Sequence, residues 1–305
     1  MIVALPYQIK VMAKKNLPTY NICNLTEQSF SSNDFIADHF DHYLKVNPNL
    51  HFPHKHSFYH LVYFSKGTGN HSIDFINFPV KAGQIYFMIP NQVHSWDFKT
   101  APNGFIVNFS EHYINSLIAN PRYLDQFSFF SGIANEQVIM VPQKAQAQIE
   151  NILGTIVNEG RSSHQLKDDM ARTALIQLFI QVDRYAEKKE RDKASNYNSL
   201  LLRNFQKLID QHYKEKKLTK DYAALLYITP NHLNALCKDA TGRSAGELIR
   251  DRVLLEAKRL LVNADLTIAE ISDELDFTDN SYFSKYFKKY TGTTPEIFRK
   301  QIIKN

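Results

Sequence analysis

Histidines concentrate in the first third of the sequence, where their spacing suits pocket or metal chemistry. Eight of the twelve lie between positions 39 and 94, including His54-Lys-His56, then His60 and later His94. Several converging imidazoles suit zinc, iron or nickel on ligand type alone, and single imidazoles titrate near neutral pH. We therefore look for an effector or metal site among these residues.

Basic residues are in excess in the last third of the sequence, where they could bind the phosphates of a nucleic acid. Residues 199–305 hold 18 Lys and Arg against 14 Asp and Glu, which accounts for +4 of the net charge of +5. This balance agrees with a nucleic-acid-binding module, although an ordinary solvated surface gives the same balance. The two cysteines, Cys23 and Cys237, are too far apart in sequence to suggest a disulfide framework or a CxxC metal site.

Short strands must position the histidines. Apolar and aromatic runs predict strands at 60–64, 72–75, 84–89 and 105–109, with a turn at Lys66–Gly69 between the first two. Closely spaced strands punctuated by Gly and Pro favour a β-barrel or sandwich.

Two helices are predicted after these strands. From about Gln143 apolar residues recur at spacings of three and four. They are Ile149, Ile152, Leu153 and Ile156, then Met170, Ala174, Leu175, Leu178, Phe179 and Val182. Such stripes either cover the barrel or form a dimer seam, and both interpretations stay open.

A charged segment separates this region from the last third. Residues 187–196 contain almost nothing apolar, which is typical of a helix end followed by a linker. We expect a first domain at 1–190, a linker at 191–198 and a second domain at 199–305.

The second domain is predicted to be helical and to contain one design twice. In the first unit a short helix begins at Thr219, and Thr229-Pro230 then opens a second helix that ends at Thr241-Gly242. In the second unit Thr267 and Glu270 form a capping box, and a helix over 280–290 ends at Thr291-Gly292. Two short helices joined by a tight turn are the helix-turn-helix design for the DNA major groove.

One long amphipathic segment, Gly246–Val262, joins the two units. At 1.5 Å per residue this helix would be about 25 Å long, so it can hold both units on one face of DNA. A single helix-turn-helix pattern is a weak signal, whereas the tandem with matched caps and stops is a strong one.

These residues also carry a family resemblance. The stretch 270–299 is similar to the signature of the AraC/XylS family of bacterial transcription regulators. Tyr222-Ala-Ala-Leu225, Pro230-Asn-His-Leu-Asn234 and Ala257-Lys-Arg-Leu-Leu261 are similar to the family's first unit and connecting helix. The match covers roughly 100 residues. It departs from the family at Asp276, where glycine is usual; aspartate is among the less costly residues in a left-handed turn.

The resemblance implies which side chains face DNA. The predicted base-reading residues lie near the start of each second helix: Asn231, Asn234 and Ala235, then Asn280, Ser281 and Lys285. Asn suits adenine and Lys suits guanine acceptors, while Ala offers only a methyl contact to thymine. The predicted phosphate contacts are Thr229, Lys238, Thr278, Lys288 and Lys289. For any one of these residues the alternative is a solvated helix face.

The histidine region resembles the two cupin motifs, in which HxH, a Glu and a later His converge inside a small barrel. His60 occupies the usual Glu position, and Pro90-Asn-Gln92 replaces the second motif's Pro-x-Gly. We expect an effector pocket lined by some of His54, His56, His60, Tyr63, Phe87, His94 and Trp96. Two alternatives stay open, a metal site at His54, His56, His60 and His94, and imidazoles that serve only the structure.

The sequence thus predicts an α+β protein of two domains, a cupin-like β-barrel followed by two helices and an all-α tandem helix-turn-helix domain. The family resemblance implies a homodimeric transcription regulator that binds double-stranded DNA and a small-molecule effector. An activator that contacts RNA polymerase and responds to a sugar is the family-level expectation. We expect no enzyme activity and no cofactor; the alternative is a metal-dependent cupin enzyme fused to a DNA-binding module.

Membrane insertion is not expected from this sequence. No apolar run approaches the roughly 18 residues that a membrane span needs. We expect a cytoplasmic protein.

Overall fold

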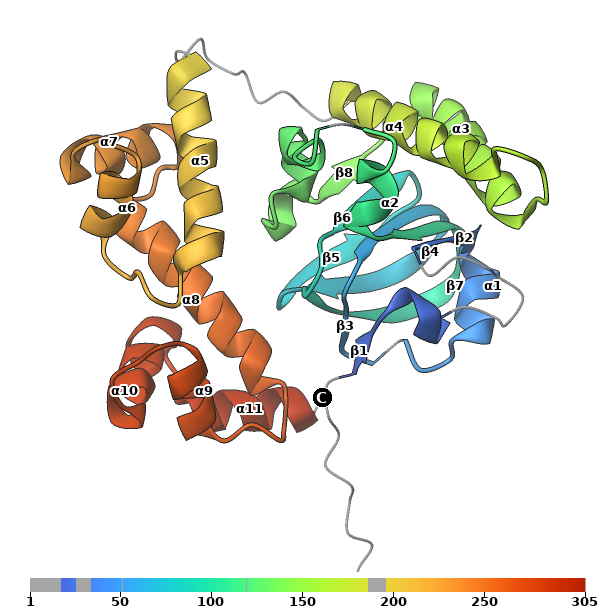
Figure 1. The fold of residues 1–305 in the computed structure, drawn as a ribbon. Coiled ribbons are helices and arrows are strands. Elements are labelled where there is room, and N and C mark those ends of the chain that lie inside the picture. Colours follow the sequence, from blue (N-terminus) through green and yellow to red (C-terminus); the bar gives the residue numbers. More distant parts are fainter. Residues whose placement is uncertain (1–17, 26–33, 51, 119, 186–195, 305) are drawn as a thin grey trace, which may run out of the picture. The chain divides into compact units, whose positions relative to one another are not determined.

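The computed structural model divides into two compact units, one spanning Pro18–Asp192 and the other containing Lys193–Asn305. It describes residues 18–25, 34–50, 52–118, 120–185 and 196–304. The first unit combines a sheet with helices and the second is helical (Figure 1). The predicted α+β class with a helical second domain is therefore confirmed.

The expected linker at 191–198 lies mostly outside the described residues, but its last three residues are an exception. Helix α5 (Asn196–His212) already includes them. The amphipathic helix extends upstream of Leu201, a buried apolar residue. The linker prediction is therefore wrong for 196–198.

The described strands of the first unit form one sheet of eight, ordered β1-β3-β7-β4-β6-β8, with β2 paired to β7 and β5 to β4. All pairings are antiparallel except that of β1 with β3. The strands are β1 (Thr19–Tyr20), β2 (Phe35–His39), β3 (His54–His56), β4 (Tyr59–Ile73), β5 (Ile76–Val80), β6 (Gln84–Met88), β7 (Val93–Phe109) and β8 (Val138–Met140).

Strands β4 and β7 are longer than their apolar runs predict. Residues Lys66–Gly69 do not form a turn, because β4 continues through them with shifts of register against β7. Gly69 has a φ of 152°, and a Cβ there would lie 2.2 Å from the carbonyl oxygen of Asp97. These glycines therefore bend a continuous strand instead of ending it. The turn falls later, at Asp74 and Phe75, whose φ values are 47° and 70°.

Alternation along the strands separates two cores. Leu61 and Tyr63 belong to the cluster that α3 (Gln143–Arg161) and α4 (Lys167–Tyr185) cover. Val62 and Phe64 belong to a second cluster on the opposite face. Figure 1 shows α3 and α4 side by side above the sheet. The predicted helix pair thus covers one face of the sheet.

Short helices complete the first unit. They are η1 (Ile22–Leu25), α1 (Phe40–Val46), α2 (Glu111–Asn115), η2 (Leu124–Gln126), η3 (Ser128–Phe130) and η4 (Ala134–Glu136).

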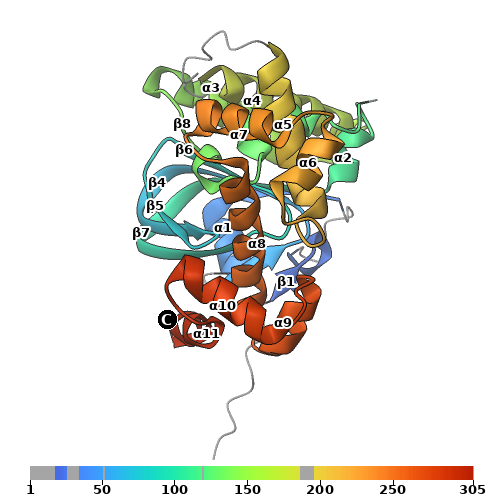
Figure 2. The same ribbon diagram turned by 90° about the vertical axis from the view of Figure 1, so that its left-hand side faces the viewer.

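Helix α8 (Ala245–Leu261) is the central element of the second unit. In Figures 1 and 2 it runs from α5–α7 at one end to α9–α11 at the other. Its neighbours are α6 (Thr219–Leu225), α7 (Pro230–Thr241), α9 (Ile268–Glu274), α10 (Asn280–Thr291) and α11 (Pro295–Lys304), the last of which the sequence did not predict. Ile249, Val253, Ala257 and Leu261 of α8 are buried in one core with residues of both flanking groups. The two helix-turn-helix units therefore share one hydrophobic core.

The helix ends agree with the predicted signals. The Thr229 hydroxyl accepts from the amide of His232, and Gly242 ends α7 in the left-handed conformation. Thr267 and Glu270 form the capping box of α9, and Gly292 ends α10 as Gly242 ends α7. Asp276 has a φ of 52°, so aspartate adopts the left-handed turn in the usual place of glycine.

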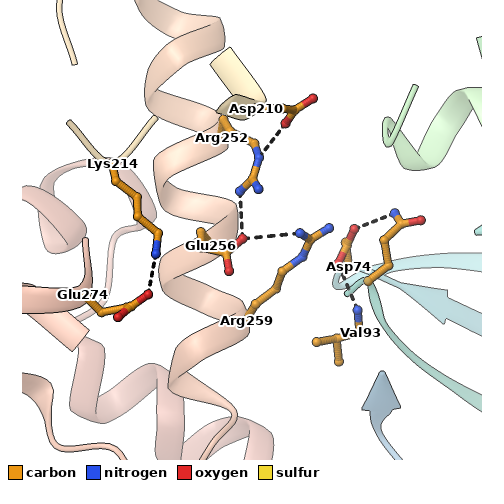
Figure 3. Close-up of polar contacts among 9 residues, drawn as sticks. Asp74, Val93, Asp210, Lys214, Arg252, Glu256, Arg259 and Glu274 are labelled. Carbon is orange, nitrogen blue, oxygen red and sulfur yellow. Dashed lines mark hydrogen bonds and ion pairs between the residues drawn. The ribbon is translucent and has the colours of Figure 1, made fainter. Parts of the chain in front are cut away.

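A polar network joins α5 to α8 (Figure 3). Arg252 donates to Asp210 and to Glu256 at 2.8 Å each, and Arg259 donates to Glu256 at 3.4 Å. Burial raises the pKa of Glu256, but the Arg252 and Arg259 guanidiniums outweigh it and hold that pKa below its ordinary value. Lys214, in the turn after α5, also pairs with Glu274 at the end of α9. The network therefore fixes α5 against α8, and the pair at Lys214 adds a contact to α9.

Candidate functional site

The second helix of each helix-turn-helix unit, α7 or α10, presents a polar face near its start. We call these two the recognition helices. Leu233, Leu236 and Cys237 fix the buried side of α7, and Phe283 and Phe287 fix that of α10. Of the predicted base-reading residues, five are exposed, namely Asn231, Ala235, Asn280, Ser281 and Lys285.

Asn234 differs from the other predicted base readers. It is half-buried, and its Oδ1 accepts from the backbone amide of Ala245 at 3.1 Å. Ala245 is the first residue of α8, so this amide has no acceptor within its own helix. Asn234 therefore holds α8 against α7 through its Oδ1, and it is less exposed than the other predicted base readers.

The two recognition helices correspond with an offset of 50 residues, since α7 begins at Pro230 and α10 at Asn280. Asn231 then corresponds to Ser281, and Ala235 to Lys285. Ser284 takes the place of Asn234 and was not predicted; its hydroxyl donates to Asn280 Oδ1 at 3.4 Å. Aligning the two helix starts in the sequence would have found it.

The predicted phosphate-contacting residues all lie on the surface. Thr229, Lys238, Thr278, Lys288 and Lys289 are exposed. The Thr229 hydroxyl accepts a hydrogen bond from the amide of His232. The O–H of Thr229 can therefore still donate to a phosphate oxygen. A solvent-open hollow beside α7 is lined by Thr219, Asn231, Asn234, Ala235, Lys238, Ser244 and Gly246.

Ser244 lies in Gly242-Arg-Ser-Ala-Gly246, which has the G-x-S-x-G spacing of a nucleophile elbow. The structure gives this serine another role. Its hydroxyl accepts from the amide of Glu247, and the Glu247 carboxylate accepts from the Ser244 amide, so the pair is the capping box of α8. The serine follows a helix end, whereas a nucleophile elbow requires a strand before it.

The predicted histidines of the first unit converge inside the sheet. His54 and His56 lie on β3, His60 on β4 and His94 on β7, and all four are buried. His94 Nε2 lies 2.8 Å from His56 Nε2. Nitrogen atoms of His54, His56 and His94 all lie within 4.8 Å of one another. The cross-strand pairing of His54 with His94 brings them together.

His71 also belongs to this cluster and was not among the predicted site residues. It is buried on β4, and its Nε2 lies 3.2 Å from His94 Nδ1. The register of β4 against β7 pairs His71 with Trp96. His71 follows His60 by an odd number of positions, so uninterrupted alternation would place the two on opposite faces of the strand. The register shifts of β4 against β7 between Phe64 and Gly69 bring both to the same side, and the wrongly predicted turn concealed this.

Burial keeps the imidazoles of His56, His60, His71 and His94 neutral. Desolvation lowers the pKa of His60 to about 3, although its bond to Asn108 opposes this shift. Burial likewise lowers the pKa of His56, His71 and His94 far below the usual value, with the neighbouring histidines adding to it. At neutral pH each ring therefore has one nitrogen lone pair.

Tyr63 and Phe87 are not part of the cluster. The Tyr63 hydroxyl donates to Glu150 of α3 at 3.0 Å, and Phe87 stacks on Phe129 with ring centroids 4.1 Å apart. Both side chains face the helices, because strand alternation turns them away from His60. Trp96 does join the histidines, with its ring centroid 4.9 Å from that of His94. The predicted grouping is therefore wrong for Tyr63 and Phe87.

Two family models match this chain. A helix-turn-helix domain matches residues 222–301, and an AraC-like ligand binding domain matches residues 42–180. This chain belongs to the AraC family. As an AraC-family member it is a DNA-binding transcription regulator with a ligand-binding domain, as predicted. The first match includes both recognition helices, and the second includes the strands that carry the histidine cluster.

Curated relatives extend over most of this AraC-family chain. The HTH-type transcriptional activator RhaR of Cronobacter sakazakii is 21% identical over 83% of this chain and 88% of its own length. The Msm operon regulatory protein of Streptococcus mutans is 26% identical over 81% of this chain and 86% of its own length. Among solved structures, ToxT from Vibrio cholerae O395 is 14% identical with a TM-score of 0.46, and covers 89% of this chain and 99% of its own.

The part of the chain that the structure describes contains no helix long and apolar enough to cross a membrane.

Proposed function

We propose that this AraC-family regulator is a transcription activator that reads a specific operator with both recognition helices. The observation that carries the proposal is the pair of matched helix-turn-helix units at the two ends of α8. Each recognition helix has a side-chain N-cap, a buried apolar side and a glycine stop. The shared core of α8 fixes their spacing, which suits successive segments of the major groove.

In this proposal the exposed residues on and beside the recognition helices form two groups, one that contacts bases and one that contacts phosphates. Asn231, Ala235, Asn280, Ser281 and Lys285 face the base edges. Thr229, Lys238, Thr278, Lys288 and Lys289 contact phosphates and set the register. Asn234 holds α7 in place for DNA binding through its hydrogen bond from the amide of Ala245 in α8.

The first unit would bind the effector and form a homodimer that works in the cytoplasm with RNA polymerase. A sugar is the effector class that we expect from the family. Apolar side chains exposed on and beside α4, namely Leu166, Met170 and Ile180, favour the dimer seam. The protein would not be an enzyme, and the names of RhaR as an activator and of the Msm protein as an operon regulator support regulation.

The proposal predicts different behaviour for two lysines of α10. An operator is first selected from random duplexes with the full-length protein. Lys285→Ala should then weaken binding by about 1–3 kcal/mol and relax preference at one base pair. Lys289→Ala should weaken binding evenly across sequences and reduce the slope of log affinity against log salt by about one.

Fluorescence anisotropy with base-substituted duplexes at several salt concentrations measures both effects. Lys300→Ala is the matched control, because Lys300 is an exposed lysine of α11, outside both recognition helices. An equal loss on every duplex for Lys285→Ala would make that residue a phosphate contact. Failure to select any preferred sequence would contradict the proposed operator reading.

A further inference from the structure

We propose that His54, His56 and His94 bind a divalent transition-metal ion inside the sheet of the first unit. This goes beyond the proposed function, since it depends neither on DNA binding nor on the effector class. It also replaces our expectation that the protein needs no cofactor. Among the described residues, this trio brings ligand atoms within 4.8 Å of one another.

The hydrogen bonds around the trio orient its lone pairs. His54 Nδ1 lies 2.7 Å from the carbonyl oxygen of Phe52. A carbonyl oxygen can only accept, so Nδ1 carries the proton and the lone pair of His54 is on Nε2. His71 Nε2 lies 3.2 Å from His94 Nδ1 and can accept its proton, which leaves the lone pair of His94 on Nε2. Proteins commonly fix metal-binding imidazoles through the nitrogen that does not bind the ion.

The ion would replace the hydrogen bond between His56 and His94. Their Nε2 atoms lie 2.8 Å apart, so one of the two carries a proton in the metal-free protein. His56 Nδ1 is buried and has no hydrogen-bond partner in the described structure. Moving the proton of His56 from Nε2 to Nδ1 would leave both Nε2 lone pairs for the metal, with no net loss of a proton.

One unsatisfied nitrogen, His60 Nε2, points to a ligand rather than to a purely structural cluster. This buried atom has no hydrogen-bond partner among the described residues. His56 Nδ1 and His71 Nδ1 have none there either, but the proposed ion would not contact those two atoms. Buried polar atoms in proteins are usually hydrogen-bonded, and exceptions need a reason. A group of imidazoles that served only the fold would be expected to bond to backbone groups.

His60 is available as a further imidazole ligand. Its ring centroid lies 4.7 Å from that of His56 and 5.1 Å from that of His94. Asn108 Nδ2 donates to the Tyr43 hydroxyl at 3.2 Å, so Asn108 Oδ1 faces His60 Nδ1 at 2.6 Å. His60 Nδ1 therefore donates, and the lone pair is on Nε2.

The donor set selects the class of metal. Neutral imidazoles suit zinc, nickel, cobalt, copper and iron, whereas magnesium and calcium require oxygen ligands. The trio contains no carboxylate, so a bound ion would keep its full positive charge. Positions that the imidazoles leave open would accept water or an oxygen of another ligand.

The test is a titration of chelator-treated full-length protein with Co²⁺, followed by displacement with Zn²⁺. Visible absorption of Co²⁺ reports nitrogen coordination, and quenching of Trp96, the only tryptophan in the sequence, places the ion near His94. We expect one equivalent of ion per chain. His56→Gln and His94→Gln should each weaken binding by at least about 100-fold, and His71→Phe by about 10- to 100-fold.

His112→Ala is the control, because His112 is exposed on α2, and it should bind as the wild type does. Circular dichroism establishes that each variant is folded. The proposal is overturned if the folded wild type binds less than half an equivalent or leaves Trp96 unquenched. Undiminished binding by His56→Gln and His94→Gln would also overturn it.

Discussion

Asn234 and Asn231 show how neighbouring residues on one recognition helix take different roles. Both amides could pair with adenine, and they lie three positions apart on α7. Asn231 is exposed, whereas Asn234 accepts a hydrogen bond from Ala245 at the start of α8. The difference arises because α8 begins beside only one of them.

These roles predict opposite effects of two matched substitutions. Asn234→Ala should lower the free energy of unfolding by about 1 kcal/mol, the usual contribution of a hydrogen bond. Asn231→Ala should leave the unfolding free energy within about 0.5 kcal/mol and weaken preference for one base pair of the operator. Urea unfolding and anisotropy on base-substituted duplexes measure the two effects. A stability loss confined to Asn231→Ala would contradict this division.

At the scale of the element, capping boxes begin both α8 and α9. In each, a hydroxyl accepts from the amide three residues later, and the glutamate at that position accepts in return. The Thr267 amide and hydroxyl both donate to Glu270 Oε2, at 2.6 Å and 2.8 Å. These bonds hold the pKa of Glu270 below its ordinary value of 4.5.

The lowered pKa predicts a pH dependence of stability. Because the folded pKa of Glu270 lies below the unfolded value, its carboxylate stabilises the fold fully above the unfolded pKa of about 4.5. This contribution is lost as pH falls through the folded pKa. The difference in unfolding free energy between wild type and Glu270→Gln should therefore be constant at pH 6–7 and shrink below about pH 4.5. Urea unfolding across this range checks it, and a difference independent of pH would count against the capping role.

At the scale of the whole molecule, each unit has its own hydrophobic core. The two clusters of the first unit and the one cluster of the second share no residues. A unit with its own core can fold by itself in principle. The α5–α8 network strengthens the second unit from within, since Asp210, Arg252 and Glu256 all belong to it.

We therefore predict that a fragment starting at Asn196 folds alone. It should unfold in one cooperative transition and retain the operator preference of the whole protein, but bind more weakly because it lacks the proposed dimer contacts. Thermal unfolding followed by circular dichroism, together with anisotropy on the selected operator, measures these properties. A fragment that melts without cooperativity would show that the second unit depends on the first.

Local signals in the sequence determined much of the second unit. Thr229-Pro230, the Thr267 and Glu270 box, and Gly242 and Gly292 are effective because capping depends on residues a few positions apart. The exposed faces of α7 and α10 followed from helical periodicity, so most of the proposed DNA-facing residues could be predicted. Asn234 could not, because its partner Ala245 comes from the next helix.

Only the tertiary structure decided the composition of the histidine cluster. His71 joins it because β4 continues through Lys66–Gly69 with register shifts against β7. Tyr63 and Phe87 are not part of it, because strand alternation and the pairing of β4 with β6 turn both to the helix-covered face. Register between strands depends on partners distant in sequence, and a one-residue change reverses the face of every side chain. The sequence therefore determined which residues could bind a ligand, while the pairing of β3, β4 and β7 decided which of them meet.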